Sequence, residues 1–308
     1  MTATPLLLAL VGPTASGKTE TGIELARARS AEICSVDSML VYRGMDVGTA
    51  KPSDEQRSAV PHHLLDLADP SERFTVARFQ EAAREAVDDV RSRDRVPLLV
   101  GGSGLYFRAV VDELSFPGED AAVRGELEAE ADDAGLEALY RRLRAVDPLG
   151  ASRIDPANRR RILRALEVEA ITGRPFSDFS AAWRRFDPER VRVAGIRMRT
   201  DVLGGRIAAR TSAMFAAGFL DEVRDLVDRG FGGWLTSTQA IGYAELARHL
   251  AGRLSLEEAW ELTVRRTKNL ARRQAAWFRR DPRVRWFDAG ADGAIGVLDE
   301  VRAYLGDT

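Results

Sequence analysis

The sequence predicts an α/β fold in which helices flank a parallel sheet and a helical insertion interrupts the chain. Three observations predict it. Short apolar runs alternate with helical patterns over the first hundred residues, which is typical of a doubly wound sheet. A glycine-rich turn joins the first run to the first helix. The pattern becomes helical after about residue 116 and returns to the sheet at 190–198.

The predicted strands are short and apolar. The run at 6–11 (LLLALV) predicts a strand buried on both faces, and 31–36 and 96–100 repeat this pattern. The segment 38–69 carries several glycines and prolines, so it predicts loops with short helices. A further strand is expected over 190–198. Helices are expected over 20–29, 74–91, 202–216, 220–229, 243–250 and 256–280, and we expect the C-terminal part to be mostly helical.

The length suggests one large or two modest domains, and the change of pattern after about residue 116 predicts two. Residues 1–116 and 191–308 form the expected α/β core with a helical C-terminal part, and 117–190 form the insertion. A chain of 308 residues buries a sizeable core without disulfides, and the single cysteine, Cys34, forms none within the chain. No 18-residue apolar stretch and no signal-peptide pattern occurs, which predicts no membrane span and a cytoplasmic location.

The overall charge conceals segregated regions. There are 45 basic and 47 acidic residues, a balance that argues against a general nucleic-acid coating protein. Segment 119–137 nevertheless holds eight acids and one base, Arg124, whereas 264–286 holds nine bases and one acid, Asp281. We read 264–286 as one basic helix. Only Lys18, Lys51 and Lys268 are lysines, a scarcity that genomic base composition explains best.

The first predicted turn is a phosphate loop. Gly12 to Thr19 (GPTASGKT) fits G-x-x-x-x-G-K-[ST] and lies between a predicted strand and a predicted helix. Backbone N–H groups of such a loop surround phosphate oxygens, the lysine adds a positive charge, and the hydroxyl of Thr19 can hold Mg²⁺. The predicted diphosphate-binding residues of this loop are Gly12, Pro13, Thr14, Ala15, Ser16, Gly17, Lys18 and Thr19. The core is therefore expected to resemble the phosphate-loop NTPases.

The loop does not identify its ligand. Hydrolases with this loop usually carry a second strand that ends in a magnesium-binding aspartate. Here the strand at 96–100 continues into Gly101, Gly102 and Ser103, without an acid. Any magnesium-bound diphosphate or triphosphate remains a candidate ligand.

Asp37 closes the second predicted strand and should face the same crevice, because the carboxyl ends of parallel strands share one edge. Three roles are open for it. It can hold magnesium through water, act as a general base, or cap the turn with Ser38.

The segments that follow resemble the tRNA dimethylallyltransferases, also called tRNA isopentenyltransferases, of the bacterial type without a zinc finger. The most specific block is 37–52 (DSMLVYRGMDVGTAKP). The resemblance continues, in chain order, at 61–66 (PHHLLD), 101–106 (GGSGLY), 164–168 (RALEV), 240–243 (AIGY) and 267–278 (TKNLARRQAAWF). It covers nearly the whole chain.

The resemblance implies transfer of a dimethylallyl group from dimethylallyl diphosphate to N6 of the adenosine 3′-adjacent to the anticodon in certain tRNAs. It also implies Mg²⁺ and release of diphosphate. The phosphate loop would hold the leaving group, so no hydrolytic apparatus is needed. By similarity Asp37 is the general base, and Ser103, at a position where the family usually has threonine, orients the acceptor. Arg206 and Arg210 resemble arginines that support the diphosphate, with Arg210 counted as catalytic beside Lys18 and Thr19.

The partner implied by the resemblance is a tRNA anticodon stem-loop, bound by a protein that we expect to be a monomer. The predicted tRNA-binding residues are Asp37, Ser38, Met39, Leu40, Ser103, Arg124, Arg160, Arg161, Arg164, Gln239, Gly242, Tyr243, Arg272, Arg273, Gln274, Trp277 and Arg279. Trp277 and Phe278 lie among the arginines, which favours RNA contact over a solvated helix face.

Some positions depart from the family. Leu40 replaces a usual glutamine, and Arg272 replaces a usual lysine. His62 and His63 match the family, and we expect a structural role for them. Two other functions stay open: a phosphate-loop kinase leaves the basic C-terminal segment unexplained, and a non-catalytic RNA-binding module leaves Lys18, Thr19 and Asp37 unused.

Overall fold

The computed structural model describes residues 7–112, 114–180, 183 and 185–306. Within these ranges no helix is both long and apolar enough to cross a membrane. The chain divides into two compact units, residues 1–112 with 187–308 and residues 113–186. The sequence placed the insertion at 117–190, four residues further along at each end.

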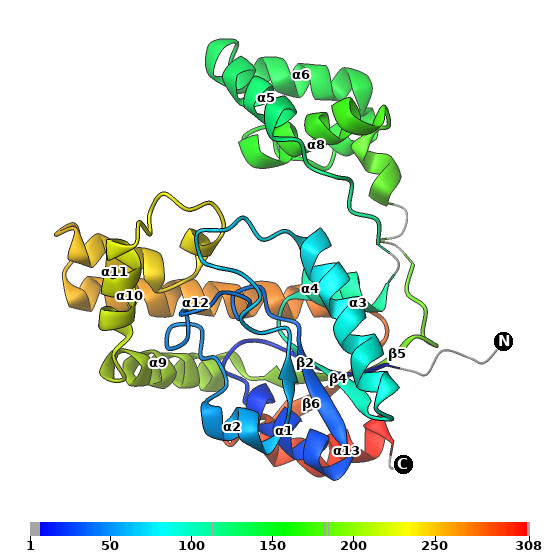
Figure 1. The fold of residues 1–308 in the computed structure, drawn as a ribbon, viewed down its shortest axis with the longest axis vertical. Helices are drawn as coiled ribbons and strands as arrows, with labels where there is room; N and C mark the ends of the chain where they lie inside the picture. The colour runs from blue at the N-terminus through cyan, green and yellow to red at the C-terminus, as the bar shows by residue number, and fades with distance from the viewer. Residues whose placement is uncertain (1–6, 113, 181–182, 184, 307–308) are drawn as a thin grey trace. The chain divides into compact units, whose positions relative to one another are not determined.

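A six-stranded parallel sheet forms the centre of the first unit (Figure 1). Its order is β3-β2-β4-β1-β5-β6, and every neighbouring pair is parallel. The strands are β1 (Leu7–Val11), β2 (Ala31–Ser35), β3 (His62–His63), β4 (Val96–Gly101), β5 (Val191–Met198) and β6 (Val284–Ala289). The predicted α/β class with a parallel sheet is confirmed.

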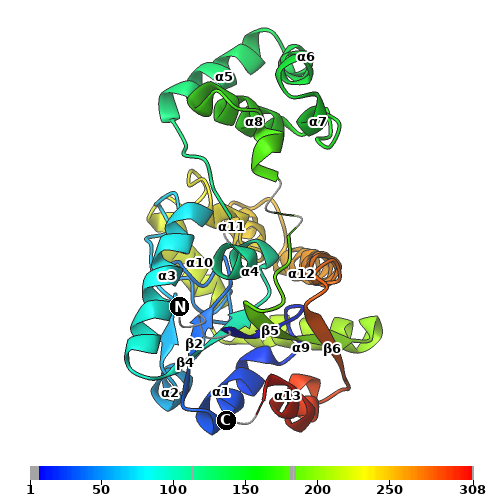
Figure 2. The same ribbon diagram turned by 90° about the vertical axis from the view of Figure 1, so that its right-hand side faces the viewer.

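Helices cover both faces of this sheet (Figure 2). On one face, Leu8, Leu10 and Ile33 pack with side chains of α1 (Lys18–Ala28) and α13 (Leu298–Leu305) in one apolar cluster. On the other face lie α3 (Val76–Ser92) and α4 (Gly104–Val111). The central strands β1 and β4 are buried on both faces almost throughout, which is why they are continuous apolar runs without alternation.

A group of helices extends the first unit beside the sheet. It comprises α9 (Thr200–Ala216), α10 (Phe219–Asp228), η3 (Ser237–Gln239), α11 (Tyr243–Leu250) and α12 (Leu256–Phe278). Ser255 begins α12 with a capping box, in which its hydroxyl accepts from Glu258 N–H and the Glu258 carboxylate accepts from Ser255 N–H. The helix α12 contacts α4, α9 and α11. Two short elements, α2 (Asp54–Ala59) and η4 (Gly293–Val297), complete this unit.

The second unit is entirely helical over its described residues. It contains α5 (Ala121–Asp133), α6 (Leu136–Val146), α7 (Pro148–Ala151), α8 (Arg159–Thr172) and η1 (Phe176–Ser180). Leu127, Leu139, Leu143, Ile162 and Leu166 form its own apolar core. The helical repeats read from the sequence are therefore the buried faces of these helices.

The C-terminal strand β6 was missed by the sequence analysis, which expected a mostly helical C-terminal part and read 264–286 as one helix. The basic segment 264–286 is not one helix, because α12 ends at Phe278 and β6 begins at Val284. In β6, Val284 and Phe287 are buried while Arg285 and Asp288 are exposed, as suits an edge strand. Charged side chains on its open face concealed the strand pattern.

Candidate active site

Three polar segments meet at the carboxyl edge of the sheet. The phosphate loop follows β1, Gly101 to Ser103 end β4 and open α4, and Asp37 follows β2. Because β1, β4 and β2 are neighbours in the sheet, these segments lie side by side. The crevice predicted from the sequence is therefore present.

Backbone geometry explains the glycines of the phosphate loop. Gly17, the N-cap of α1, has φ +88°, and a Cβ there would lie 3.1 Å from Ala294 N. Gly12 has φ +152°, and a Cβ there would lie 2.9 Å from the carbonyl oxygen of Ile196. Glycine is the residue that tolerates both the left-handed backbone and the close approach. The loop thus stays open toward the N-terminus of α1, where phosphate binds best.

Lys18 is buried inside this loop. Its Nζ donates to the carbonyl oxygen of Pro13 at 2.5 Å and to Ser16 Oγ at 3.4 Å. Burial, and next the positive charge of Arg210, lower the pKa of Lys18 to about 7, while Asp37 acts in the opposite direction. An anionic ligand would offset both lowering effects. The loop is therefore poised to bind negative charge.

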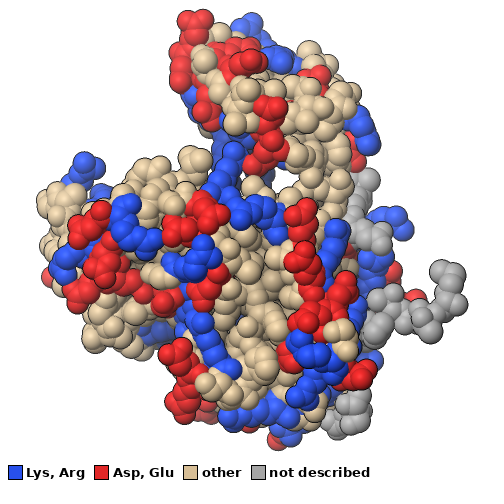
Figure 3. Space-filling model, in the orientation of Figure 1, with Lys and Arg blue, Asp and Glu red and all other residues tan. Residues whose placement is uncertain are grey.

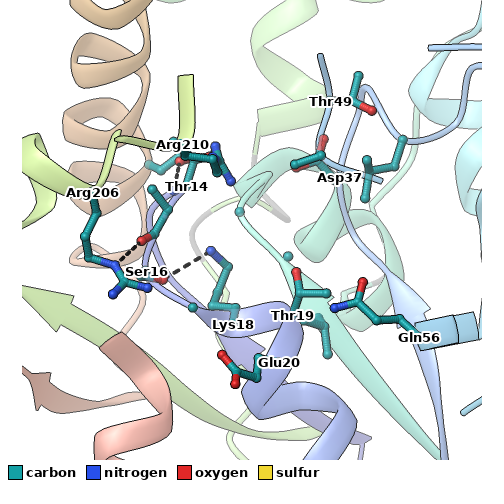
Figure 4. Close-up of a pocket in the computed structure, with 18 of the residues that line it drawn as sticks. Thr14, Ser16, Lys18, Thr19, Glu20, Asp37, Thr49, Gln56, Arg206 and Arg210 are labelled. Carbon is teal, nitrogen blue, oxygen red and sulfur yellow. Dashed lines mark hydrogen bonds between the residues drawn. The ribbon is translucent and has the colours of Figure 1, made fainter. Parts of the chain in front are cut away.

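Two arginines from α9 approach the loop. Arg206 donates from Nε to the carbonyl oxygen of Ala15 at 2.9 Å and from Nη1 to that of Ala291 at 2.7 Å. Arg210, one turn later, donates to the hydroxyl of Thr14, and burial lowers its pKa, with a smaller contribution from Arg206. Figure 4 shows Lys18, Arg210 and Asp37 around one space. Lys18, Arg206 and Arg210 thus line one cavity of 460 Å³, against the acids Glu20 and Asp37.

Asp37 is half-buried at the end of β2. Its Oδ1 accepts the backbone N–H of Met39 at 2.9 Å, which is the turn-capping role considered from the sequence. Oδ2 has no hydrogen-bond partner in the described part of the chain. One carboxylate can therefore cap the turn with one oxygen and offer the other to a substrate proton or a magnesium-bound water.

A second cavity of 690 Å³ adjoins the first. Six residues line both: Thr14, Asp37, Thr49, Gly102, Arg210 and Gln274. The second cavity combines apolar and aromatic side chains with hydroxyl, amide and basic ones, and its walls include Met39, Ser103, Met214, Phe219, Gln239, Ile241, Leu270, Arg273 and Trp277. Asp37 therefore stands where a cationic cavity meets a cavity suited to an aromatic, hydrophobic substrate.

The helix α12 packs directly on the site. Gln274 Oε1 accepts the backbone N–H of Thr14 in the phosphate loop at 2.8 Å. A Cβ on Gly102 would lie 2.4 Å from Gln274 Nε2, and one on Gly104 would lie 2.2 Å from the ring of Trp277. The glycines after β4 are thus needed so that α12 can approach the phosphate loop.

Ser103 is the N-cap of α4 and lines the second cavity. Its Oγ accepts from the backbone N–H of Tyr106 at 3.4 Å, so the hydroxyl hydrogen is available to a ligand. Thr19 is exposed at the start of α1 and lines the first cavity together with Asp37. Leu40 also lines the first cavity, and Ser38 lines the second.

These oxygen donors fit magnesium. The described residues contain no cluster of three or more His, Cys, Asp or Glu side chains that could hold a metal ion by itself. Mg²⁺ seldom uses such a cage, because it keeps several waters and binds one or two protein oxygens plus substrate phosphates. The hydroxyl of Thr19 and the carboxylate of Asp37, on walls of the same cavity, provide such oxygens.

The basic side chains of 264–286 fall into three groups: those that pack inside the protein, those that pair with a neighbouring side chain, and those without a partner. Arg283 is buried and paired with Asp112 at 2.8 Å and with Asp281 at 2.7 Å, and Arg285 lies over the rings of Phe287 and Tyr304. Arg266 pairs with Glu245, and Arg272 donates to Asn269. Among the described residues, the basic side chains here without a hydrogen-bond, ion-pair or ring partner are those of Arg265, Lys268, Arg273, Arg279 and Arg280.

Two aromatic side chains in segments expected to face RNA, Phe278 and the predicted tRNA-binding residue Tyr243, are buried. Phe278 is fully buried and packs against Phe107, with ring centroids 5.6 Å apart. Tyr243 is fully buried, and its hydroxyl donates to Glu222 at 2.5 Å. Neither ring is accessible to a base. Gly242 is also buried, at the start of α11, whereas Gln239 is exposed beside the second cavity.

In the helical unit, the predicted RNA contacts fall into two pairs. Arg124 and Arg164 both donate to the buried carboxylate of Glu167, Arg164 at 2.9 Å within α8, and the Arg124 bond joins α5 to α8. Arg160 and Arg161 are exposed at the start of α8, and within the described chain their side chains have no such partner. Arg160 and Arg161 are therefore the better placed for RNA.

Sequence reasoning missed two residues that shape the site. Lys51 is buried and binds Asp66 at 2.6 Å, the carbonyl oxygen of Tyr42 at 2.8 Å, and Asp46, so it holds the loop before α2. Glu222, on α10, binds the backbone of the same loop. The scarcity of lysine drew attention to Lys51, but no local pattern distinguished Glu222 from the neighbouring surface acids.

The histidines have the structural role that was expected. His63 Nε2 lies 2.6 Å from a Glu32 carboxylate oxygen, and His62 Nδ1 lies 2.7 Å from the carbonyl oxygen of Val60. Both residues form β3 at the edge of the sheet. They lie among the walls of neither cavity.

Comparisons with known proteins agree with this geometry. Residues 40–281 match the family model described as IPP transferase. The chain is 50% identical to the tRNA dimethylallyltransferase of Nocardioides sp. over 296 residues, 95% of either protein, and 46% identical to that of Desulforudis audaxviator, with 98% of each covered.

Solved structures give the same result. The full-length tRNA isopentenylpyrophosphate transferase of Bacillus halodurans is 41% identical, with 98% of this chain and 96% of that chain covered and a TM-score of 0.71. A eukaryotic dimethylallyltransferase acting on tRNA shares the fold at 23% identity, with 97% of this chain and 78% of that chain covered and a TM-score of 0.82. The chain therefore belongs to the IPP transferase family, whose members compared here are tRNA dimethylallyltransferases and tRNA isopentenylpyrophosphate transferases.

Proposed function

We propose that this protein transfers a dimethylallyl group from dimethylallyl diphosphate to N6 of the adenosine 3′-adjacent to the anticodon in tRNA, releasing diphosphate. The position of Asp37 supports this most directly, since it borders both the cationic cavity and the aromatic one. A transfer between a diphosphate ester and a nucleobase needs these two cavities side by side.

The cationic cavity would hold the diphosphate. As the allylic C–O bond breaks, negative charge grows on the departing oxygen. The loop amides, Lys18 and Arg210 surround the place where that charge develops, so they stabilise the transition state more than the ground state. Arg206 fixes the loop by donating to the carbonyl oxygen of Ala15.

Magnesium fits this half of the site, with the hydroxyl of Thr19 as the protein group that would hold it, which leaves Oδ2 of Asp37 for the N6 proton. When bound, Mg²⁺ would neutralise part of the diphosphate charge and make it a better leaving group. The positions of Lys18 and Arg210 around the same cavity are independent of the metal.

Asp37 would accept the proton that N6 loses during attack. The exocyclic amine of adenine is a weak nucleophile because its lone pair is delocalised into the ring. A bond forms between N6 and the allylic carbon, the C–O bond breaks, diphosphate leaves, and the N6 proton passes to Oδ2 of Asp37. Such general-base help is worth about 10²–10⁴-fold. Ser103, beside the second cavity, would orient the amine.

The adenosine must leave its stack to enter the second cavity. That costs a few kcal/mol, least in a single-stranded loop. Trp277 lines this cavity and can stack on a base, which returns about 1–3 kcal/mol. Arg273, in the same wall, and Arg279, just beyond α12, are cations free to bind the phosphates around the flipped base. On the face shown in Figure 3, basic and acidic side chains are interspersed, so this face offers no broad basic surface for RNA.

A phosphate-loop kinase is the rival function. It accounts for Lys18 and Thr19 but assigns no role to the second cavity or to the contact between Gln274 and the phosphate loop. The prenyl-transfer proposal uses both features.

One assay separates the candidates. The protein is incubated with unmodified tRNA, Mg²⁺ and labelled dimethylallyl diphosphate, with ATP in a parallel reaction. We expect the label to appear on a tRNA adenosine next to the anticodon. We also propose that the protein acts as a monomer in the cytoplasm. Phosphate transfer from ATP without labelled tRNA would establish the kinase instead, and tRNA binding without either reaction would establish a binding module.

A further inference from the structure

One carboxylate on α10 receives an unusual set of hydrogen bonds. Glu222 accepts the backbone N–H groups of three consecutive residues, Asp46 at 2.9 Å, Val47 at 2.8 Å and Gly48 at 3.1 Å. It also accepts from the hydroxyl of Tyr243 at 2.5 Å. Each carboxylate oxygen takes two donors: Oε2 takes Asp46 and Val47, and Oε1 takes Gly48 and Tyr243.

The surroundings of Glu222 admit only an acceptor. Burial, and next the Glu222 charge, raise the pKa of Tyr243 well above its usual value, so the phenol stays protonated and donates. The three backbone N–H groups can only donate hydrogen bonds. Around Gly48 the packing is tight as well, because a Cβ there would lie 2.1 Å from Phe219 and 2.6 Å from Tyr243. The loop is thus pressed onto α10 and α11.

The loop held in this way forms a wall of both cavities. Gly48 and Thr49 line the second cavity, and Thr49 and Ala50 line the first. In Figure 4 Thr49 lies close to Asp37. From the other side Lys51 binds Asp46 and Asp66. The wall facing Asp37 is therefore fixed by two anchors, the buried amine of Lys51 and the half-buried carboxylate of Glu222, and Glu222 is the one that accepts hydrogen bonds from three consecutive backbone N–H groups of the loop.

We propose that Glu222 is a positioning residue for prenyl transfer: its carboxylate fixes the Asp46–Thr49 wall that aligns the allylic carbon and the adenine amine beside Asp37. The inference rests on the proposed function. Glu222 lines neither cavity, so it acts through the loop rather than on a substrate. An alignment error of about 1 Å at reacting atoms can cost about 10²-fold in rate.

The test is Glu222→Gln, assayed for prenyl transfer and for amide hydrogen exchange. Whichever way the new amide turns, at least one backbone N–H of the loop faces another donor. We expect kcat to fall by about 10–100-fold, the tRNA Kd to stay unchanged, and exchange at Asp46, Val47 and Gly48 to accelerate. Asp221→Asn is the matched control, because it removes an exposed carboxylate from the same helix that pairs only with Arg224 among the described residues.

Two results would overturn the proposal. One is faster exchange of the three amides with unchanged kcat and KM, which would make the anchor irrelevant to the reaction. The other is unchanged exchange in Glu222→Gln. If Glu222→Gln is too unstable to assay, Glu222→Asp withdraws the carboxylate by one methylene from the same three N–H groups and should both lower kcat and accelerate their exchange; faster exchange with unchanged kcat would again overturn the proposal. If the wild-type protein does not prenylate tRNA, the proposed function fails. If the wild-type protein is active and only the Glu222→Gln results disagree, the inference about Glu222 fails.

Discussion

Gln274 and Thr14 are 260 positions apart in the chain, and the side chain of the first accepts the backbone N–H of the second at 2.8 Å. This bond ties the basic helix α12 to the phosphate loop. The sequence assigned Gln274 to tRNA binding, and its position also gives it a direct role in the shape of the diphosphate site.

We expect Gln274→Ala to raise the KM for dimethylallyl diphosphate while leaving the tRNA Kd nearly unchanged. The substitution leaves the Thr14 N–H without its acceptor, which costs about 1–3 kcal/mol, or roughly 5–150-fold in affinity. Steady-state kinetics with each substrate varied in turn measures the effect. Asn269→Ala, on the same helix but away from the loop, is the control. A weaker tRNA complex with a normal donor KM would restore the RNA-binding role.

Asp37→Ala should lower kcat by about 10²–10⁴-fold and leave the tRNA Kd intact, since the variant removes the proton acceptor from a site that still binds RNA. Asp37→Asn separates base from cap: its amide oxygen can still accept the Met39 N–H, but the side chain cannot take the N6 proton. Single-turnover rates of both variants decide whether Asp37 is needed as a proton acceptor or as the cap of the turn. Full activity in Asp37→Asn would show that capping is the essential role.

The pKa of Lys18 predicts the pH dependence of donor binding. Burial and Arg210 lower it to about 7, and only the protonated amine attracts diphosphate. The kcat/KM for the donor should therefore fall as pH rises through about 7, since kcat/KM reports the free enzyme. Bound diphosphate raises this pKa again, so the alkaline fall in kcat should occur at higher pH.

The control for this prediction is Lys18→Gln, whose weaker kcat/KM should lack the alkaline fall. If the wild-type kcat/KM for the donor is flat between pH 7 and 9, Lys18 is not the group whose protonation controls diphosphate binding.

The same pKa also fixes how the free energy of unfolding changes with pH. Protonated Lys18 destabilises the fold below about pH 7, where it is charged in both states, and this cost is relieved as the pH rises toward the unfolded value of 10.5.

Charge reversal of Arg272 and Arg273 should weaken tRNA binding and flatten its salt dependence. Removing one arginine–phosphate ion pair should reduce the slope of log K against log salt by about 0.7–0.9. Filter binding over a range of salt concentrations measures this. Arg253→Glu is the control, since this arginine is exposed outside α12 and lines neither cavity. An unchanged slope for the double variant would place the RNA elsewhere.

Sequence reasoning succeeded where the signal is local. The strand, glycine loop and helix at 7–28 form one continuous unit, so their order along the chain already predicts an anion site at the helix N-terminus. Strands buried on both faces appear as apolar runs, and β1, β2 and β4 were found for that reason. The edge strand β6 alternates exposed arginine and aspartate with buried residues, and its charges were read as part of a helix.

Long-range pairing decided which charges are available to a ligand. In sequence, Arg283 and Arg273 are equivalent members of one basic run. In the structure Arg283 is buried between Asp112 and Asp281, whereas Arg273 lines the second cavity. No local pattern predicts this difference, because Asp112, one of the two acids that pair with Arg283, lies 171 positions away.

The sequence alone determined the α/β class, the phosphate loop, the acid after the second strand and the family resemblance. Each depends on residues adjacent in the chain, whose backbone geometry and burial follow from local pattern. Only the tertiary structure decided that Asp37 joins two cavities, that Gln274 bonds to the phosphate loop, and that Glu222 holds the wall opposite Asp37. Packing sets those contacts, because it brings together groups that are distant in sequence. The Thr14 N–H then meets the side-chain oxygen of Gln274, and the Val47 N–H meets the carboxylate of Glu222.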